Sequence, residues 1–497
     1  MRTALALCAA ELLRAFAAYG QAPFALDTTF RATFPTWYVA SALPLPDGKV
    51  LVAGQVHPPD EPFPLIHAGL CRLNADGSWD ESFPESSIGR GKIIPWDDRF
   101  YVSSSQTVRR VLYNGAQDFS FIEMNLGLYF TSLQGGDYHV FPDGRVVMSG
   151  MHMLNDPVRG FVGDYNFIWF SNQGYLDTTR THRNGNGALY DFIELPDGKF
   201  IADYNGTVYD GRPTSGIQRM HADGSLDTTF WTGMNWGITN AFLPDSEGRV
   251  YAGGNFTLAG APNDTLRLAR FLANGELDPS FTIPVLGLGE LAYSSVFALQ
   301  VGGLYRLPSG AIVVTGRFQE VNGQPRRGIC AIDSTGALLP VFENAGVSPY
   351  QYQGTTLASV YNIAPSADGE NWFVWGGYHG YSDGILNDTA QRFVTRLHGG
   401  DINIGVQEQA VEEDGRTFRV QPNPASTFVS LNFALLTSDA DGALRVLDPI
   451  GRVIANEKLQ GTQGQALLDT RQWAKGAYTV QCMVAGALVH AEKLIIQ

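Results

Sequence analysis

The sequence predicts an all-β protein built from repeated units and followed by a smaller β domain. Glycine contributes 56 and phenylalanine 29 of the 497 residues, and only 17% of the residues are charged. This composition suits a turn-rich β protein better than a helical one. Two short signatures, each a pair of strands joined by a tight turn, also recur along most of the chain. Because the chain is too long for one ordinary core, this recurrence favours a large repeat architecture.

The first signature is clearest at His221 to Phe230, HADGSLDTTF. Asp223 and Gly224 provide the backbone freedom that a tight turn requires, while Leu226 and Phe230 are apolar anchors on the second strand. Similar strings end at Phe83, Phe121, Arg180, Phe281 and Phe342. We therefore expect one hairpin of this kind in each repeat.

The second signature precedes the first and is clearest at Leu45 to Val56, LPDGKVLVAGQV. It combines a turn at Asp47 and Gly48 with a strand that reaches Gly54. Related strings end at Gly150, Phe256, Phe318 and Tyr378 or begin at Pro95 and Leu195. Two hairpins in each repeat give four strands.

The order of the copies predicts a closed ring. The first copy of the HADGSLDTTF signature, Leu26 to Phe30, lacks its leading strand, and the last unit, around Gln391 to Leu397, stops without an outer strand. An open solenoid has no reason to divide one unit between its two ends. Since each signature occurs seven times, we expect a seven-bladed β-propeller closed by the N-terminal outer strand Leu26 to Phe30.

Strand direction predicts where a ligand would bind. The short turns of both signatures share one face of the ring, whereas the longer and more variable connections share the opposite face, which is the usual place for function. Aromatic residues expected on this loop face are candidates for stacking on sugar rings or peptide side chains, with packing between blades as the alternative for each. These candidates are Trp37, Tyr129, Tyr165, Trp231, Trp236, Tyr350, Tyr352 and Tyr381.

Two histidines on the loop face form a separate candidate. His57 and His379 occupy corresponding places in the first and last blades, which are neighbours in a closed ring, and His152 lies further round. A pair of imidazoles there could bind a metal ion or act chemically on a substrate. We favour the interpretation that these are ordinary, solvent-exposed histidines of loops. We therefore predict no bound metal and no cofactor.

Several classes of function are disfavoured by the sequence. It contains no nucleophile elbow, phosphate loop, HExxH helix or paired-cysteine motif, and turn chemistry accounts for the repeated acidic turns better than calcium binding does. The net charge of −15 disfavours nucleic acid and anionic lipid as partners. Cys71 and Cys330 share one repeat position, occupied elsewhere by Ala269 and Ile168, so we expect buried thiols without a disulfide.

The N-terminal residues 1–20 have the outline of an export signal. Arg2 precedes an apolar run, and Ala17, Ala18 and Gly20 provide small residues near its end. Glu11 and Arg14 interrupt the run, and a short amphipathic helix is the alternative. No later stretch approaches the ~18 apolar residues of a membrane-spanning helix.

The repeats resemble a known family. The alternating LPDG(K/R) and RL…DG…LDxxF signatures are similar to the delta-sixty type repeats, which are predicted β-propellers common in secreted bacterial proteins. The resemblance extends from about Leu26 to His398 and implies a propeller over residues 21–399 and an exported protein. It implies no catalytic residues.

The C-terminal part has a different pattern. Residues 400–417 form an acidic linker, and Phe418 to Gln497 alternates apolar residues as in the short strands of a small β-sandwich. This segment closely resembles the C-terminal sorting domain of the type IX secretion system, apart from Ala477, where a larger apolar residue is common. The resemblance implies export across an outer membrane by that machinery, followed by release or surface attachment. Its motif residues here are Pro422, Asn423, Pro424, Gly451, Arg452, Gly476, Tyr478 and Lys493.

Together these patterns favour an exported, monomeric propeller that acts as a binding or adhesion module for an unidentified glycan or protein ligand. A secreted hydrolase for polysaccharide or peptide, with its site at the propeller mouth, stays open as an alternative and would require convergent carboxylates. A structural spacer without a specific ligand is the third possibility.

Overall fold

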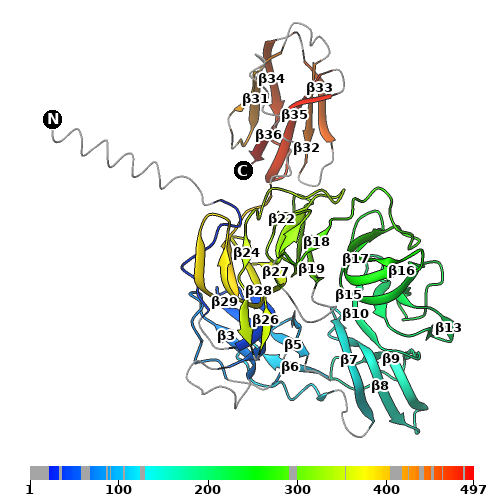
Figure 1. Cartoon of the computed structure of the whole chain (residues 1–497). Coiled ribbons are helices and arrows are strands. Elements are labelled where there is room, and N and C mark those ends of the chain that lie inside the picture. Colours follow the sequence, from blue (N-terminus) through cyan, green and yellow to red (C-terminus); the bar gives the residue numbers. More distant parts are fainter. Residues whose placement is uncertain are drawn as a thin grey trace, which may run out of the picture. The chain divides into compact units, whose positions relative to one another are not determined.

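The computed structural model describes residues 22–496 in part. The segments left out are 33–35, 58–67, 85–87, 90, 104–106, 124–128, 290, 292–298, 353, 403–416, 422, 424, 436–441, 449–452, 460, 462 and 485–486. The chain divides into two compact units, the first ending at Ile404 and the second beginning at Gly405 (Figure 1). The expected signal, residues 1–20, and most of the expected acidic linker, 400–417, lie outside the described residues.

The first unit consists of consecutive antiparallel sheets, each with three main strands. Their strands are β1 (Thr36–Pro44), β2 (Val50–Val56) and β3 (Ala68–Leu73); β4 (Ile93–Trp96), β5 (Arg99–Ser103) and β6 (Val108–Leu112); β7 (Phe130–Val140), β8 (Val146–Asp156) and β9 (Phe161–Phe170); β10 (Leu189–Glu194), β11 (Phe200–Tyr204) and β14 (Gly216–Met220); β15 (Met234–Pro244), β16 (Val250–Leu258) and β17 (Ala261–Phe271); β19 (Gln300–Arg306), β20 (Ile312–Arg317) and β23 (Ile329–Ile332); and β27 (Ser359–Pro365), β28 (Asn371–Ser382) and β29 (Asn387–His398).

Short strands complete this unit. β12 (Val208–Tyr209) pairs with β13 (Arg212–Pro213), β25 (Tyr350–Tyr352) pairs with β26 (Thr355–Leu357), and β24 (Gly346–Val347) adds to β28. A further small sheet joins β18 (Leu286–Gly287), β21 (Glu320–Val321) and β22 (Gln324–Pro325). They all lie between the main strands in sequence, in the connections rather than in the repeats.

Each main sheet contacts the next in chain order, and the last contacts the first. Contacts join β1 to β4, β5 to β7, β7 to β10, β10 to β15, β15 to β19, β19 to β27, and finally β27 and β28 to β1. In Figure 1 the colours follow this order from blue through cyan and green to yellow, and the yellow β28 and β29 lie beside the blue first sheet. This arrangement is that of a β-propeller.

The expected fourth strand is much shorter than predicted. In most sheets it contributes a single β-bridge, such as Leu73 with Trp79 and Met220 with Leu226, before the chain turns away. The cause is the aspartate of the signature: Asp80 Oδ1 accepts hydrogen bonds from the backbone and the hydroxyl of Ser82, at 3.1 and 2.6 Å. Such an Asx turn replaces the extended backbone that a strand would need.

An arginine, the same aspartate and a phenylalanine form a repeated cluster, here called the clamp. The arginine Nε donates to the aspartate Oδ2 at 2.6–2.8 Å, and the guanidinium lies 4.8–5.2 Å from the centre of the phenylalanine ring. The ring therefore stabilises the cation while the carboxylate neutralises it. The clamps are Arg72–Asp80–Phe83, Arg110–Asp118–Phe121, Arg219–Asp227–Phe230, Arg270–Asp278–Phe281 and Arg396–Asp27–Phe30.

The clamp also joins neighbouring sheets. Arg219 donates from Nη1 to the carbonyl of Ala273 in the turn of the next sheet, at 2.6 Å. The backbone N–H of Trp231, just after the same clamp, donates to the carbonyl of Asn274 at 3.0 Å. Gly275 in that turn has φ = 91°, and a Cβ there would lie 2.6 Å from the Trp231 nitrogen. Glycine is thus required because the neighbouring sheet approaches so closely.

Two sheets depart from the clamp in ways that keep the charges balanced. In the third sheet, Trp169 occupies the position of the clamp arginine and Arg180 occupies the position of the clamp phenylalanine. The guanidinium still lies 4.4 Å from the centre of the indole ring. In the sixth, Ala331 and Leu339 replace both the arginine and the aspartate. Losing both partners together avoids leaving one buried charge unpaired.

The N-terminal segment pairs with the last sheet, as the divided repeat predicts. Leu26 forms an antiparallel bridge with Leu397, and the Phe24 N–H donates to the His398 carbonyl at 3.0 Å. Arg396 then donates to the carbonyl of Ala75 in the first sheet at 2.7 Å. The junction between last and first sheets therefore uses the same bond as the internal junctions.

The repeat cysteines lie in the interior. Cys71 faces Val52 and Cys330 faces Val314 across the strand pairs, and both thiols are 1% exposed. The same register position holds Ala269 opposite Ala252 and Ile168 opposite Met148. Packing accounts for both residues, and burial raises the pKa of the Cys330 thiol to about 12.

The second unit contains two sheets. One is β30 (Thr417–Gln421), β31 (Phe428–Ala434) and β34 (Gln463–Asp469), and the other is β33 (Val453–Lys458), β32 (Gly442–Leu447), β35 (Gly476–Val484) and β36 (Ala487–Ile496). Residues of both sheets, among them Val429, Leu431, Val446 and Val480, share one hydrophobic cluster.

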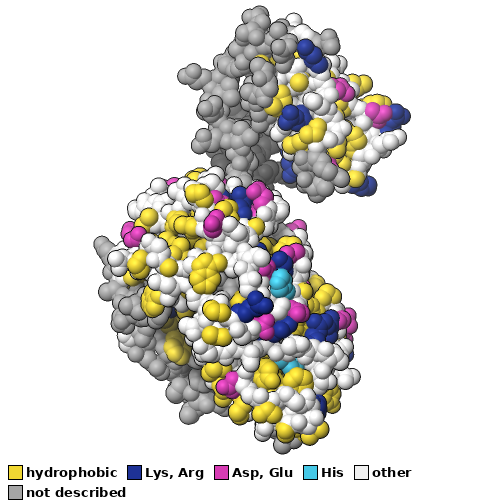
Figure 2. All heavy atoms as spheres, turned by 90° about the vertical axis from the view of Figure 1, so that its right-hand side faces the viewer, with side chains coloured by type: hydrophobic (Ala, Val, Ile, Leu, Met, Phe, Trp, Pro, Cys, Tyr) yellow, Lys and Arg dark blue, Asp and Glu magenta, His cyan; other side chains and the backbone are white. Residues whose placement is uncertain are grey.

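The surface of the molecule mixes side-chain types. On the face shown in Figure 2, acidic side chains are scattered, several lie beside lysine or arginine, and hydrophobic side chains are interspersed among them. In the described part of the chain, no helix is long and apolar enough to cross a membrane.

Candidate functional site

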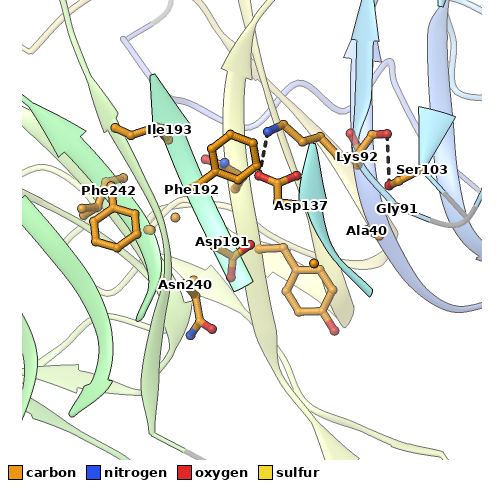
Figure 3. Close-up of a pocket in the computed structure, with 18 of the residues that line it drawn as sticks. Ala40, Gly91, Lys92, Ser103, Asp137, Asp191, Phe192, Ile193, Asn240 and Phe242 are labelled. Atoms are coloured by element: carbon orange, nitrogen blue, oxygen red, sulfur yellow. Dashed lines mark hydrogen bonds and ion pairs between the residues drawn. The ribbon is translucent and has the colours of Figure 1, made fainter. Parts of the chain in front are cut away.

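The first strands of the sheets in the first unit surround a cavity of about 470 Å³ (Figure 3). Every main sheet contributes to its wall, from Ser41 on β1 to Asn362 on β27. Because these strands are the innermost of the circle of sheets, the cavity is the central channel of the propeller. Glycine residues at several wall positions leave space that larger side chains would fill.

The charged side chains of the channel gather on one part of its wall. Lys92 Nζ lies 2.9 Å from Asp137 Oδ2 and 3.2 Å from the Tyr138 carbonyl. Figure 3 shows Lys92 reaching Asp137, with Asp191 and Asn240 close to this pair. Burial, together with the charges of Asp137 and Asp203, raises the pKa of Asp191 to about 8.

A second pocket of about 360 Å³ adjoins the channel. It is lined by Tyr190, Asp191, Asp203, Ile238, Thr239 and Asn240. Asp203 is only 1% exposed: its Oδ1 accepts a hydrogen bond from the Thr239 hydroxyl at 3.3 Å, whereas its Oδ2 has no hydrogen-bond partner among the described residues. Burial raises the pKa of Asp203 to about 7.

A groove of about 360 Å³ continues from this pocket between β11 and β15. Its walls are aromatic rings, amides and hydroxyls, and none of the described residues that line it carries a charge. Trp236 is 49% exposed beside the groove. The groove shares Tyr190 and Ile238 with the pocket, and the pocket shares Asp191 and Asn240 with the channel. The three cavities are therefore neighbours, each sharing wall residues with the next, and they are here called the path.

Hydrogen bonds hold the groove side chains in place. The Tyr190 hydroxyl accepts from Gln134 Nε2 at 2.7 Å and from Asn205 Nδ2 at 2.9 Å, while Asn205 Oδ1 accepts from the Ala188 N–H at 2.6 Å. The Tyr204 hydroxyl donates to the Val208 carbonyl at 2.6 Å. A ligand would therefore meet side chains that are already ordered, which lowers the entropy cost of binding.

Three of the candidates predicted from the sequence come together elsewhere, where the first and last sheets meet. The rings of Tyr350 and His379 are stacked with their centres 4.1 Å apart, and the Tyr350 hydroxyl donates to the Trp37 carbonyl. Burial, reinforced by the charge of Arg392, lowers the pKa of His379 to about 4. This cluster joins two sheets by packing.

The other two candidate histidines are buried. His57 is 2% exposed and His152 is not exposed at all. The two ring nitrogens of His152 are within hydrogen-bond distance of the Ser132 hydroxyl and the Ser149 carbonyl, at 3.1 and 2.7 Å. Within the described ranges, no group of three histidine, cysteine or acidic side chains is arranged to hold a metal ion.

The remaining aromatic candidates are dispersed. Trp231 is 55% exposed, but its backbone contact with Asn274 places it beside a short turn and not in the groove. Tyr165 is half-buried with its ring 6.1 Å from that of His182, and Tyr381 is fully buried. Tyr352 lies in β25, where it pairs with Thr355, and Arg159 lies 5.5 Å above the ring of Tyr129.

Strands that are longer than expected explain several of these positions. Several candidates were expected in the connections of the loop face, but β8 extends to Asp156, β9 begins at Phe161, and β28 extends to Ser382. Side chains of a strand alternate between two faces, so His152 and Tyr381 point into the packed interior.

The acidic residues of the path were not identified from the sequence. Asp203 lies in β11 within FIADY, where every side chain is buried. A carboxylate within such an apolar strand is a signal that sequence reasoning could have used, because a buried acid requires a partner or a function. Asp191 has no comparable signal, since in its strand only Leu189 and Phe192 are buried and the other residues are half-buried.

In the second unit, Asn423 explains part of the C-terminal motif. Its Nδ2 donates to the Lys493 carbonyl at 2.5 Å, and its Oδ1 accepts from the Ile495 N–H at 2.9 Å. Tyr478 is buried and donates to the Ala474 carbonyl at 2.8 Å, and Gly476 begins β35. Pro422, Pro424, Gly451 and Arg452 lie outside the described residues.

Comparison with known proteins agrees with this division of the chain. Residues 195–230 and 246–281 match the family model described as "Domain of unknown function (DUF5122) beta-propeller", and residues 419–497 match that of the "Secretion system C-terminal sorting domain". The fold and the matches define an exported β-propeller protein. Its export is by type IX secretion, to the cell surface or beyond.

Solved structures show distant similarity. An oligogalacturonate lyase from Vibrio parahaemolyticus has 10% identity and a TM-score of 0.41, with 75% of this chain and 92% of that chain covered. The Neurospora crassa Pan2 WD40 domain has 11% identity and a TM-score of 0.35, covering 76% and 99%. A protein of unknown function from Bacteroides caccae has 12% identity and a TM-score of 0.29, covering 54% and 88%. A search of curated proteins finds no match.

Proposed function

We propose that this exported protein is a binding module that holds a glycan in the groove beside Trp236. Sugar rings offer apolar faces for stacking on aromatic side chains and hydroxyl groups for hydrogen bonds to amides. The groove supplies both, through Tyr190, Asn205, Thr207, Asn235 and Trp236. The exposure of Trp236 at this position is the observation that carries the proposal, because indole is the side chain most often found at the centre of binding energy.

The proposal also assigns seven blades to the propeller that contains the groove. Support comes from the seven copies of each signature, from the contacts that run from sheet to sheet and back to the first, and from Arg396, which bonds to Ala75 as the internal clamps bond to their neighbours. The domain boundaries that follow are 21–399 for the propeller, 400–417 for the linker and 418–497 for the sorting domain. The shared hydrophobic cluster of its two sheets supports a β-sandwich for the last.

An array that carries both glycans and peptides, probed with the purified protein, tests the function. We expect binding to a subset of glycans, and a loss of about tenfold or more in affinity for the variant Trp236→Ala, since about 1.4 kcal/mol of stacking energy corresponds to a factor of ten. Trp231→Ala is the matched control, because Trp231 is equally exposed but lies outside the groove, and it should bind as the unaltered protein does. Binding to peptides only would contradict the proposal, and binding to neither class would favour a spacer.

Hydrolysis is the second candidate function, because the carboxyl groups of Asp191 and Asp203 share one pocket next to the groove. Glycoside cleavage usually requires a pair of carboxyl groups that flank the scissile bond. A glycan that binds on the array should then be shortened on incubation with the protein. Products of unchanged length would exclude this activity and leave the binding function.

A further inference from the structure

We infer that the pocket of Asp191 and Asp203 receives a protonated primary amine of the ligand, so that the glycan bound in the groove is an amino sugar polymer with free amino groups. This inference rests on the proposed function and adds to it the chemical class of the ligand. It depends on three features of the path from the groove to the channel: an unsatisfied acceptor, the local balance of charge, and the wall residues that neighbouring cavities share.

The unsatisfied acceptor is Asp203 Oδ2. The side chain is 1% exposed, lies on the wall of the pocket, and has no partner for this oxygen within the part of the chain that the structure describes. A buried carboxylate oxygen without a donor is costly. A donor supplied by a ligand would remove that cost.

The balance of charge favours a cationic donor. Asp137, Asp191 and Asp203 line the channel or the pocket, whereas Lys92 is the one basic residue among the described residues of both linings. Lys92 is already held by Asp137 at 2.9 Å. An ammonium group has three donors and a positive charge, and the residues with oxygen acceptors that line the pocket are Asp203, Asp191 and Asn240. Asn240 uses its Nδ2 to donate to the Val301 carbonyl at 3.2 Å, which leaves its amide oxygen as an acceptor.

The wall that the groove and the pocket share gives the position of the amine relative to the sugar. Tyr190 and Ile238 line both the groove and the pocket. A ring stacked in the groove therefore lies next to the pocket, and a substituent on it can enter while the rest of the chain stays in the groove. An N-acetyl group at the same place would bring an uncharged amide and an additional methyl group to the two acids.

The protonation of the acids provides an independent signature. Burial and the neighbouring acids raise the pKa of Asp191 to about 8, and burial raises that of Asp203 to about 7. The other titratable groups in the linings of the channel and the pocket are Asp137, Lys92, Tyr190 and Tyr361. A bound ammonium favours the ionised carboxylates. Binding at mildly acidic pH should therefore release protons from the protein.

The test compares two oligosaccharides of equal length, a β-1,4-linked glucosamine oligomer and its fully N-acetylated form, by titration calorimetry with the full chain. We expect the free-amine oligomer to bind about tenfold or more tightly, with proton release seen as a dependence of the measured heat on the ionisation enthalpy of the buffer. Asp203→Asn should abolish this preference and the proton release while retaining affinity for the acetylated oligomer. Asp264→Asn, a substitution of an exposed acid on β17, should leave both unchanged.

Several results would overturn the inference. Equal affinities of the unaltered protein for the two oligomers, or binding of the acetylated form alone, would exclude the amine and leave the glycan-binding function intact. Binding of a lysine-containing peptide in place of either oligomer would show that the amine belongs to a protein ligand. If Asp203→Asn does not fold, Asp191→Asn provides the same comparison, and a preference that persists in a folded variant of either acid contradicts the proposed site.

Discussion

The ion pair between Asp27 and Arg396 is predicted to hold the N-terminal segment on the last sheet. The substitution Asp27→Asn keeps Oδ1 as the acceptor for Thr29 but places an amide N–H₂ group opposite the Arg396 Nε, which is now 2.7 Å from Oδ2. The two side chains are 7% and 15% exposed. Removing one member of a largely buried pair costs about 3–5 kcal/mol, and this degree of exposure places the expected loss at about 3 kcal/mol.

Opening of this segment can be measured directly by hydrogen exchange. The amides of Phe24 and His398 bond across the junction, to the carbonyls of His398 and Ala25. A loss of about 3 kcal/mol should reduce their protection about 100-fold, since about 1.4 kcal/mol is a factor of ten.

The internal clamp offers a matched control. Asp278→Asn breaks the equivalent pair with Arg270, which is 4% exposed on both sides. It should lower the free energy of unfolding by a similar amount without a selective loss of protection at Phe24 and His398. Unchanged protection of these two amides in Asp27→Asn would refute the role of the ion pair in closing the propeller.

Three further predictions follow from the structure. A double-mutant cycle of Trp169→Leu and Arg180→Leu should give a coupling energy of about 1 kcal/mol in urea unfolding, because a cation–π contact replaces the usual clamp there; a value near zero would show that the exchange is not compensated. Because folding raises the pKa of Asp203 from 3.8 to about 7 and also raises that of Asp191, the folded protein binds additional protons, so the free energy of unfolding should fall as the pH rises from about 4 to 7, with Asp203 contributing at most about 1.4 kcal/mol for each pH unit; Asp203→Asn should make this dependence shallower by that contribution, and an unchanged slope would contradict it. Asn423→Ala should destabilise the second unit by about 1–3 kcal/mol and reduce the amount of protein in the medium, whereas Asn432→Ala, at an exposed position of β31, should not.

The sequence was sufficient for the features that depend on repetition. Seven copies and a divided unit led to the pairing of Leu26 with Leu397, and the exchange of Cys71 with alanine and isoleucine led to its burial. The outer strand was overestimated because the aspartate in LDTTF was treated as part of a strand, although its carboxylate caps a turn at Ser82 and its equivalents. That competition between side-chain and backbone hydrogen bonds is visible only once the partner atoms are placed.

The site was harder to infer because it is assembled from positions far apart in the chain. Trp236 was identified as an aromatic residue near a connection, but its neighbours Tyr190 and Asn205 belong to the preceding sheet. Asp203 had a local signal that was not used, whereas Asp191 becomes distinctive only beside Asp137 and Asp203. The repeats also directed attention to the loops, while the acids lie within strands β10 and β11.

The junction of Arg396 with Asp27 has a consequence for how the chain folds. Its two residues are 369 positions apart, so the contact that completes the ring is also among the most distant in sequence. Contacts of this kind form late, since loop closure must precede any gain in energy. Until then the last sheet presents an unpaired edge, which is prone to pair with other chains. A chain that is complete but not yet closed would therefore be most vulnerable to aggregation at β29, and release of the N-terminal segment would recreate that vulnerability in the finished molecule.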